Sequence, residues 1–374
     1  MTGHHRSRRL AAAALTAVFP LVLAACSTDV PNTTFQTRSE FGQAIDALTY
    51  RLVYLGTGVG VLVAALLVYV VWRFRSRPGN LEPKQIHGHT TLEIVWTLVP
   101  AVILAFIAVP TIRTIFQTQA QAIPGALQVE VIGHQWWWEF RYPQYNVTTA
   151  NELYLPVGRT ANLALRTADV LHSFWVPRMG GKRDLISNHT NYIWFTPDSA
   201  FAWNGICAEY CGHSHANMRF KVFTVPPAEF ERWIAHQRGP AAQTAPVAYT
   251  LEQLPPHIVP NTPIPSGVDM PDLAGDAARG AQLYARSACI GCHYVQGVSP
   301  GIVGPNLTHV GSRTTIAAGM YPNDMRHLAR WLKNAPAMKP GSLMPPMGRG
   351  LPNSMGNLDD QQIADIAAYL LSLK

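Results

Sequence analysis

The stretch that decides the fold of this 374-residue chain is Cys207-Ala-Glu-Tyr-Cys211-Gly-His-Ser-His215-Ala-Asn-Met218. It brings two thiols, an imidazole and a thioether into 12 residues. Soft sulfur ligands together with imidazole select copper over hard cations. One cysteine would suit a mononuclear blue site, whereas two cysteines allow two bridged coppers. The alternatives are a tetrahedral zinc site or a disulfide, and the thioether and the β context favour copper.

A copper pair needs another histidine from elsewhere in the chain. His172, in Asp169-Val-Leu-His-Ser-Phe-Trp175, is the candidate. His213 and His189 are also nearby, and we predict that each is a surface or packing histidine.

The residues around this stretch, 121–237, have the pattern of an all-β domain. Leu127-Gln-Val-Glu-Val-Ile132 alternates apolar and polar residues, as a half-buried strand does. Short strands separated by turn residues predict a sandwich or barrel. Three further strands are predicted at Ala161–Arg166, Asn191–Thr196 and Arg219–Val225.

Residues 238–271 differ from the β domain in composition. They hold eight Pro in 34 positions and only three charged side chains. This composition predicts a stiff, extended linker.

Residues 272–374 have the pattern of a helical domain. A helix is predicted over Asp276–Ala288, after Gly275. Asn357 or Asp359 is the predicted cap of a final helix. One apolar face of that helix is formed by Ile363, Ile366, Ala367 and Leu370.

Cys289-Ile-Gly-Cys292-His293, in the helical domain, is the C-x-x-C-H signature of c-type haem attachment. The two thiols add to the haem vinyl groups, and His293 supplies an axial nitrogen to iron. A structural zinc or a dithiol redox pair is the alternative, but a histidine directly after the second cysteine favours haem.

The sixth ligand of the haem iron is expected in the loop 337–347, which carries three methionines. We predict Met344, because the two prolines that follow it reduce the entropy cost of holding a thioether against iron. Met347, after the same prolines, is the runner-up. Met325 lies in a predicted helix, where packing is its expected role.

The first of three apolar runs predicts an export signal over residues 1–25. A basic stretch, Met1–Arg9, precedes 16 uncharged residues, which are too few to span a bilayer comfortably. The small residues before Cys26 resemble a bacterial lipoprotein signal, in which that cysteine is lipidated and becomes the mature N-terminus. An ordinary signal peptide with an incidental cysteine is the alternative, and both place the mature N-terminus outside the cytoplasm.

The other two runs, Leu52–Trp72 and Ile94–Ile112, predict transmembrane helices within residues 26–120. Each is long enough to cross a hydrocarbon core of about 30 Å. The loop between them carries Arg73, Arg75, Arg77 and Lys84. The positive-inside rule therefore places this loop in the cytoplasm and both ends of the hairpin outside.

Composition excludes other classes of protein. Hydrophobic residues make up 48% of the chain, so disorder throughout is excluded. The formal charge of +7 includes three arginines of the export signal, and therefore is no evidence for nucleic-acid binding.

These motifs together resemble a known family. Residues 40–235 resemble subunit II of haem–copper cytochrome c oxidases, and residues 272–374 resemble a class I cytochrome c. The combination is similar to the caa-type oxidases of bacteria. The resemblance implies a two-helix transmembrane hairpin, a β cupredoxin-like sandwich or barrel, and an all-α class I cytochrome c domain.

The resemblance also implies a binuclear copper site, CuA. Its six ligands would be the bridging thiolates of Cys207 and Cys211, His172, His215, Met218 and the carbonyl oxygen of Glu209. The carboxylate of Glu209 is expected to reach a magnesium ion at the boundary with subunit I. No copper ligand is missing, which argues against quinol oxidases, whose subunit II has lost these ligands.

Two further roles come from the resemblance. Trp136, in Gly133-His-Gln-Trp-Trp-Trp138, corresponds to the port through which electrons reach copper, whereas Trp137 and Trp138 are expected to be core residues or membrane-interface anchors. Glu93 matches a glutamate at the mouth of the K proton pathway. Its alternative role is in a capping box that begins at Thr90.

The resemblance assigns supporting contacts in the cytochrome c domain. Gly304-Pro305 would support the ligand His293. The terminal helices would cross where Gly280 and Tyr284 meet Ile366 and Tyr369.

The function implied is electron transfer into a proton-pumping respiratory oxidase in the bacterial inner membrane. Electrons would pass from cytochrome c or an upstream bc-type complex through haem c and CuA to subunit I, where O2 is reduced to water. Subunit III and membrane lipid are expected partners, and nucleic acid is not. The rivals are a nitrous-oxide or nitric-oxide reductase component, which Glu93 and Trp136 disfavour, and a copper-delivery lipoprotein, which the haem domain disfavours.

Overall fold

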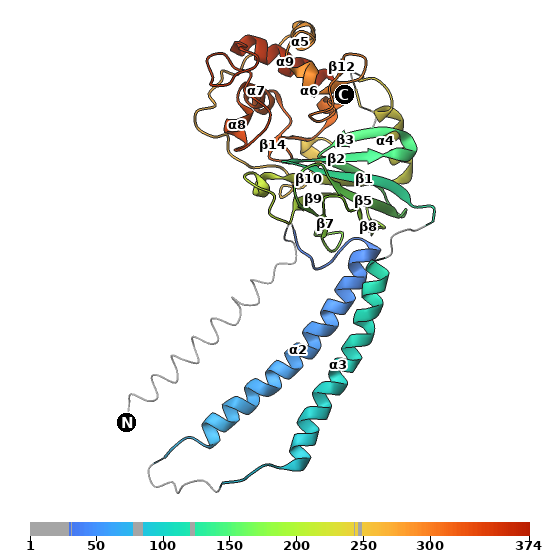
Figure 1. Cartoon of the computed structure of the whole chain (residues 1–374), viewed down its shortest axis with the longest axis vertical. Coiled ribbons are helices and arrows are strands. Elements are labelled where there is room, and N and C mark those ends of the chain that lie inside the picture. Colours follow the sequence, from blue (N-terminus) through green and yellow to red (C-terminus); the bar gives the residue numbers. More distant parts are fainter. Residues whose placement is uncertain (1–29, 31, 78–84, 120–123, 243, 246–248) are drawn as a thin grey trace.

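The computed structural model describes residues 30, 32–77, 85–119, 124–242, 244–245 and 249–374. Two long helices stand beneath a β domain, and a helical domain lies on the far side of that β domain (Figure 1). The predicted export signal, 1–25, and Cys26 lie outside the described residues.

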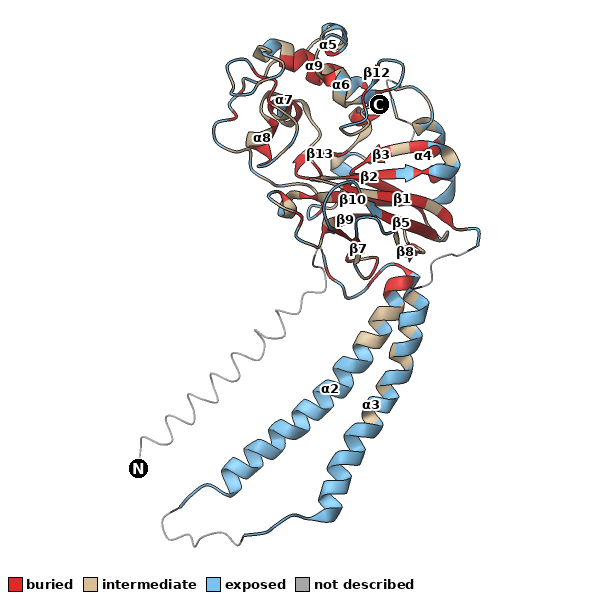
Figure 2. Ribbon diagram, in the orientation of Figure 1, coloured by how far each residue is buried: buried red, intermediate tan, exposed pale blue. Residues whose placement is uncertain are grey.

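The two long helices contain the predicted membrane spans. Helix α2 (Glu40–Arg73) and helix α3 (Thr90–Thr118) lie side by side and are long and apolar enough to cross a membrane. Most of their side chains are exposed, and the buried residues lie at the start of α2, next to the β domain (Figure 2). Apolar surface of this extent is stable only against lipid or the membrane helices of a partner.

The β domain is a sandwich of two five-stranded sheets, which confirms the predicted architecture. One sheet has the order β3-β2-β1-β5-β8, with β1 (Leu127–His134), β2 (Trp137–Tyr142), β3 (Val147–Ala150), β5 (Ala161–Thr167) and β8 (Asn191–Phe195). The other has the order β4-β10-β9-β6-β7, with β4 (Glu152–Pro156), β6 (His172–Trp175), β7 (Arg183–Leu185), β9 (Phe201–Cys207) and β10 (Arg219–Val225). All four predicted strands are present.

Several elements of this domain were missed from the sequence. Strand β4 is buried at every position, and β6 and β7 have only four and three residues. Such strands carry no alternation of apolar and polar residues from which to predict them. Helix α4 (Pro227–Gln237), which packs on the sandwich through Phe230 and Trp233, was also missed.

The described residues of the Pro-rich segment 238–271 pack against the two domains. The ring of Tyr249 stacks on Phe223, with 4.6 Å between ring centroids. Ile258 belongs to the core of the β domain, whereas Val268 and Met270 belong to the core of the helical domain. The segment is therefore a structural part of both domains, which its composition did not predict.

The helical domain contains five helices: α5 (Ala277–Tyr284), α6 (Cys289–Cys292), α7 (Met325–Lys333), α8 (Ala335–Met338) and α9 (Asp360–Ser372). Helix α5 is shorter than predicted and ends at Tyr284. Asp359, rather than Asn357, caps α9 in a capping box with Gln362.

Helices α5 and α9 cross at a glycine. A Cβ atom on Gly280 would lie 1.9 Å from the carbonyl oxygen of Asp365. Beside the crossing, the rings of Tyr284 and Tyr369 lie 5.4 Å apart. Arg279 pairs with both oxygens of Asp365, at 2.8 and 2.9 Å, so the crossing is held by packing and by a bidentate ion pair.

We expect Gly280→Ala to destabilise the helical domain by at least about 1–3 kcal/mol, because main-chain atoms of α9 would have to move. Denaturation of the chain, followed through haem absorbance, measures this change. Gly239→Ala is the matched control, since its Cβ would meet no atom closer than 3.5 Å. Equal stability of the two variants would contradict the prediction.

Candidate copper and haem sites

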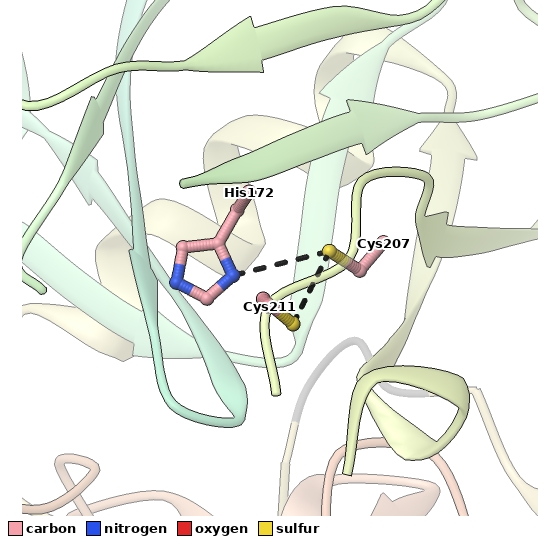
Figure 3. A group of neighbouring side chains, drawn as sticks. All are labelled: His172, Cys207 and Cys211. Atoms are coloured by element: carbon pink, nitrogen blue, oxygen red, sulfur yellow. Dashed lines mark hydrogen bonds between the residues drawn. The ribbon is translucent and has the colours of Figure 1, made fainter. Parts of the chain in front are cut away.

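The proposed copper ligands come from two neighbouring strands and the loop that follows. Strand β9 ends at Cys207, and its antiparallel pairing with β6 places His172 beside it (Figure 3). Cys211 lies in the loop after β9. His215 begins the short helix η2 (His215–Asn217), and Met218 directly precedes β10.

The donor atoms of these residues converge. The two Sγ atoms lie 3.7 Å apart. The Sγ atom of Cys207 is 3.9 Å from Nδ1 of His172 and 3.3 Å from the carbonyl oxygen of Glu209. Two further donors flank the Sγ atom of Cys211, namely His215 Nδ1 at 3.6 Å and Met218 Sδ at 3.8 Å. The structure thus brings all six predicted donors together.

The charge state of the two thiols fits a cationic centre. A hydrogen bond from the Cys211 thiol, helped by His172, lowers the pKa of Cys207 to about 3. The hydrogen bond with Cys207, together with burial, raises the pKa of Cys211. A second thiolate so close to the Cys207 thiolate would be repelled by it. Two buried sulfurs flanked by imidazoles are a soft donor set that copper cations satisfy.

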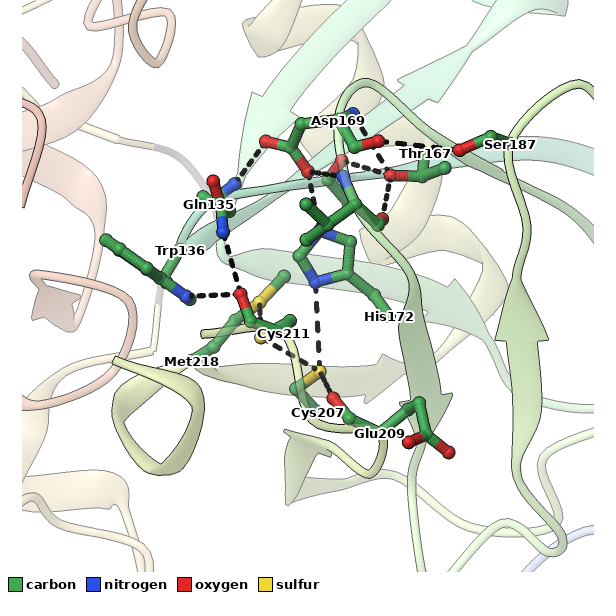
Figure 4. A network of polar contacts seen from close by, with 12 residues as sticks. Gln135, Trp136, Thr167, Asp169, His172, Ser187, Cys207, Glu209, Cys211 and Met218 are labelled. Carbon is green, nitrogen blue, oxygen red and sulfur yellow. Dashed lines mark hydrogen bonds and ion pairs between the residues drawn. The ribbon is translucent and has the colours of Figure 1, made fainter. Parts of the chain in front are cut away.

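His172 is held in place by Asp169 and by close packing against Gly133. Its side chain is fully buried, and its Nε2 lies 2.8 Å from Oδ1 of Asp169. The other oxygen of Asp169 accepts the main-chain N–H of Gln135 at 2.6 Å. A Cβ on Gly133 would lie 2.8 Å from the His172 ring, so only glycine fits there. These contacts leave Nδ1 of His172 directed at Cys207 (Figure 4).

Trp136 is hydrogen-bonded to residues 207–218, which we call the copper loop. Its indole Nε1–H donates to the carbonyl oxygen of Cys211 at 3.0 Å, and the side-chain amide of Gln135 donates to the same oxygen at 2.8 Å (Figure 4). Trp138 is a fully buried core residue, as predicted. The expectation for Trp137 was wrong, because its ring stacks on His134 and also lines the cavity described next.

A cavity of about 240 Å³ lies in the helical domain and reaches the β domain. Cys289, Cys292 and His293 line one part of it, and Trp136 and Trp137 line another. The cavity therefore places the predicted haem attachment site next to the proposed copper loop.

The ring of His293 is fixed by Gly304 and Pro305, as the family resemblance implied. Its Nδ1 lies 2.8 Å from the carbonyl oxygen of Pro305, which leaves Nε2 available to iron. A Cβ on Gly304 would lie 2.5 Å from this ring. Burial lowers the pKa of His293, so the neutral, metal-binding form is favoured.

Three methionines line the same cavity: Met344, Met347 and Met355. Met344 is half-buried and Met347 is buried, whereas Met355 is largely exposed. Met325 begins α7 and packs, partly buried, against the core of the helical domain, in agreement with its predicted packing role.

The remaining predicted residues lie away from these centres. His213 and His189 are exposed, as predicted. The carboxylate of Glu209 points away from the two thiols (Figure 4). Glu93 lies in the first turn of α3, where its carboxylate accepts the main-chain N–H of His89 at 3.1 Å. The capping partner is thus His89 rather than Thr90, because the helix cap lies one residue earlier than predicted.

Comparison with known proteins identifies the family. Residues 33–114 match the transmembrane domain of cytochrome c oxidase subunit II, residues 146–225 match its periplasmic domain, and residues 277–374 match cytochrome c. The chain is 33% identical over 322 residues to cytochrome c oxidase subunit 2 of Alkalihalophilus pseudofirmus, covering 84% of this chain and 83% of that protein. This chain belongs to the cytochrome c oxidase subunit II family.

A second relative agrees with this membership. Subunit 2 of the Bacillus subtilis oxidase is 30% identical over 384 residues, covering 96% of each chain. The solved periplasmic domain of oxidase subunit II from Bradyrhizobium japonicum is 28% identical, with a TM-score of 0.30, and covers 31% of this chain and 97% of that domain.

Membership in the subunit II family gives the broad function. The chain is a membrane-bound subunit of a respiratory cytochrome c oxidase of the caa type, with its own cytochrome c domain. Its partner is subunit I, and cytochrome c is the donor. The periplasmic domain implies copper, and the cytochrome c domain implies haem c.

Proposed function

We propose that this subunit accepts electrons at haem c and passes them through CuA to subunit I, where O2 is reduced and protons are pumped. The observation that supports this most directly is that one residue, Trp136, contacts both sites. Trp136 lines the haem cavity and is bonded to the carbonyl oxygen of Cys211. Cofactors on the two sides of one side chain are well placed for electron transfer.

The copper pair would be held by the converging donors of the β domain. Cys207 and Cys211 would bridge two coppers, and His172 and His215 would bind one copper each. Met218 and the carbonyl oxygen of Glu209 would complete the two sites. When bound, the pair would supply one-electron redox chemistry, and the protein would tune it through ligand identity, burial and the Asp169–His172 contact.

Haem c would be attached through Cys289 and Cys292, with His293 and Met344 as axial ligands. The chain's own contribution is the orientation of these groups, since Gly304-Pro305 fixes the histidine ring. Met–His ligation raises the haem potential relative to other ligand pairs.

The membrane hairpin would place both sites on the outer face of the bacterial inner membrane. Arg73 at the end of α2, and Arg75 and Arg77 after it, support a cytoplasmic loop. Lipidation of Cys26 would add a second anchor to the membrane. The outward-pointing carboxylate of Glu209 would bind magnesium where subunit I docks, and subunit III would complete the complex.

Rapid mixing of the reduced donor, cytochrome c, with the oxidised complex tests the proposed order of transfer. We expect haem c to be reduced first and CuA afterwards, as followed by absorbance. Reduction of CuA before haem c would overturn the proposal.

Glu93 is proposed to feed protons into the K pathway, and its capping contact allows the two roles to be separated. We expect Glu93→Gln and Glu93→Ala to slow oxidase turnover by a similar factor, with unchanged transfer from haem c to CuA. The amide of Gln still accepts the His89 N–H, but it carries no proton.

Turnover and flash-induced electron transfer in the purified complex measure these two quantities. A loss with Ala alone would leave only the capping role, which is typically worth about 1 kcal/mol.

A further inference from the structure

Lys339 is a buried lysine at the boundary between the two extramembrane domains. It directly follows α8 and belongs to the cytochrome c domain. Its Nζ donates to the carbonyl oxygen of Trp136, in the β domain, at 2.6 Å and to that of Ala317 at 3.3 Å. Only 4% of the residue is exposed. A buried ammonium is costly unless its hydrogen bonds are made, so this geometry is specific.

The two residues after Lys339 contact the same region of the β domain. The hydroxyl of Ser214, in the copper loop, donates to the carbonyl oxygen of Pro340 at 2.5 Å. A Cβ on Gly341 would lie 3.0 Å from the Trp136 ring, so glycine permits this close approach. The loop that carries Met344 therefore begins with three residues seated on Trp136 and the copper loop.

A second buried ionisable side chain, this time from the β domain, makes hydrogen bonds across the boundary. Glu152 of β4 is 2% exposed, and its carboxylate accepts the main-chain N–H and the hydroxyl of Thr314, both at 2.7 Å. The N–H of Thr315 donates to the same oxygen at 3.3 Å. Nearby, the N–H of Arg219 donates to the carbonyl oxygen of Ala318 at 3.2 Å. These hydrogen bonds all join one domain to the other.

We propose that Lys339 is a positioning residue that locks the haem cavity onto Trp136, so that the two domains transfer electrons from one fixed docked arrangement. The inference rests on the proposed function for its redox consequence. Any other docked arrangement of the two domains would bury the Lys339 ammonium and the Glu152 carboxylate without these hydrogen-bond partners. Such an arrangement is therefore disfavoured. Ile258, in the core of the β domain, and Met270, in the core of the helical domain, support fixed docking, because the short chain between them is anchored in both domains.

Hydrogen exchange in the purified oxidase complex tests the docking without relying on electron transfer. The amides of Thr314, Thr315 and Arg219 bond across the boundary and report its opening. In Lys339→Met, two buried carbonyl oxygens lose their donor in the docked state, and we expect these amides to exchange about tenfold faster. Unchanged exchange in this variant would overturn the role of Lys339.

Lys333→Met is the matched control. Lys333 lies on α7 of the same domain. Its Nζ forms an ion pair with Asp360 and donates to the carbonyl oxygen of Asp269, so neither contact reaches the β domain. We expect the three reporter amides to keep their wild-type exchange. An intact haem spectrum in both variants shows that the cytochrome c domain is folded.

Flash-induced transfer from haem c to CuA provides the second readout. In the wild type we expect a rate that is independent of solvent viscosity, because no domain movement is required, whereas Lys339→Met should become slower and viscosity-dependent. A wild-type rate that falls in proportion to viscosity would overturn fixed docking. If the complex lacked the haem c or CuA spectrum, the proposed function would fail instead, while hydrogen exchange would still test the docking.

Discussion

Cys207→Ser is expected to remove the copper pair and to stop oxidase turnover, while haem c remains reducible by its donor. Cys207 Sγ lies within 4 Å of Cys211 Sγ, of the His172 ring and of the Glu209 carbonyl oxygen, so its loss affects both halves of the centre. A serine hydroxyl is a harder, neutral donor that does not replace a bridging thiolate.

Metal analysis and electron paramagnetic resonance measure the outcome. The wild-type chain should hold two coppers in a mixed-valence pair, and the variant should lose that signal. His213→Ala is the matched control, because His213 is an exposed histidine in the same loop. One copper per wild-type chain, with a single-copper spectrum, would refute the binuclear assignment.

Met344→Leu is expected to abolish the sulfur-to-iron absorption band near the red end of the spectrum and to lower the haem potential. Loss of an axial thioether is a large change, since axial ligands span about 0.8 V in haem proteins. Met347→Leu is the paired control, because Met347 lines the same cavity from the same loop. Visible spectra and redox titration of the two variants make the comparison.

The reverse pattern would transfer the axial role to Met347. Retention of the band in both variants would place the ligand outside the loop. Met355 would then be the next candidate, because it also lines the cavity.

The sequence predicted the parts of this protein whose signals are local. The copper loop and the C-x-x-C-H signature each lie within a short stretch, so spacing and ligand chemistry suffice to recognise them. The membrane helices are long, uninterrupted apolar runs. The predicted strand that begins at Leu127 was found because the alternation of a half-buried strand, which β1 shows, is visible in the sequence itself.

Other elements of the fold and the sites leave no such local signal. Strand β4 is buried throughout, and the burial of Ile258 in one core and of Met270 in the other requires both domains to be folded. The role of Trp137 in lining the haem cavity requires the neighbouring domain to be in place.

By itself, the sequence determined the ligand types, the two attachment motifs and the membrane hairpin, because each depends on residues close together in the chain. Only the tertiary structure decided which distant residues meet them. Pairing of β6 with β9 brings His172 to Cys207, 35 residues away, and domain contact brings Lys339 to Trp136, 203 residues away. Such meetings depend on the cooperative packing of whole sheets and domains, which no short stretch of sequence encodes.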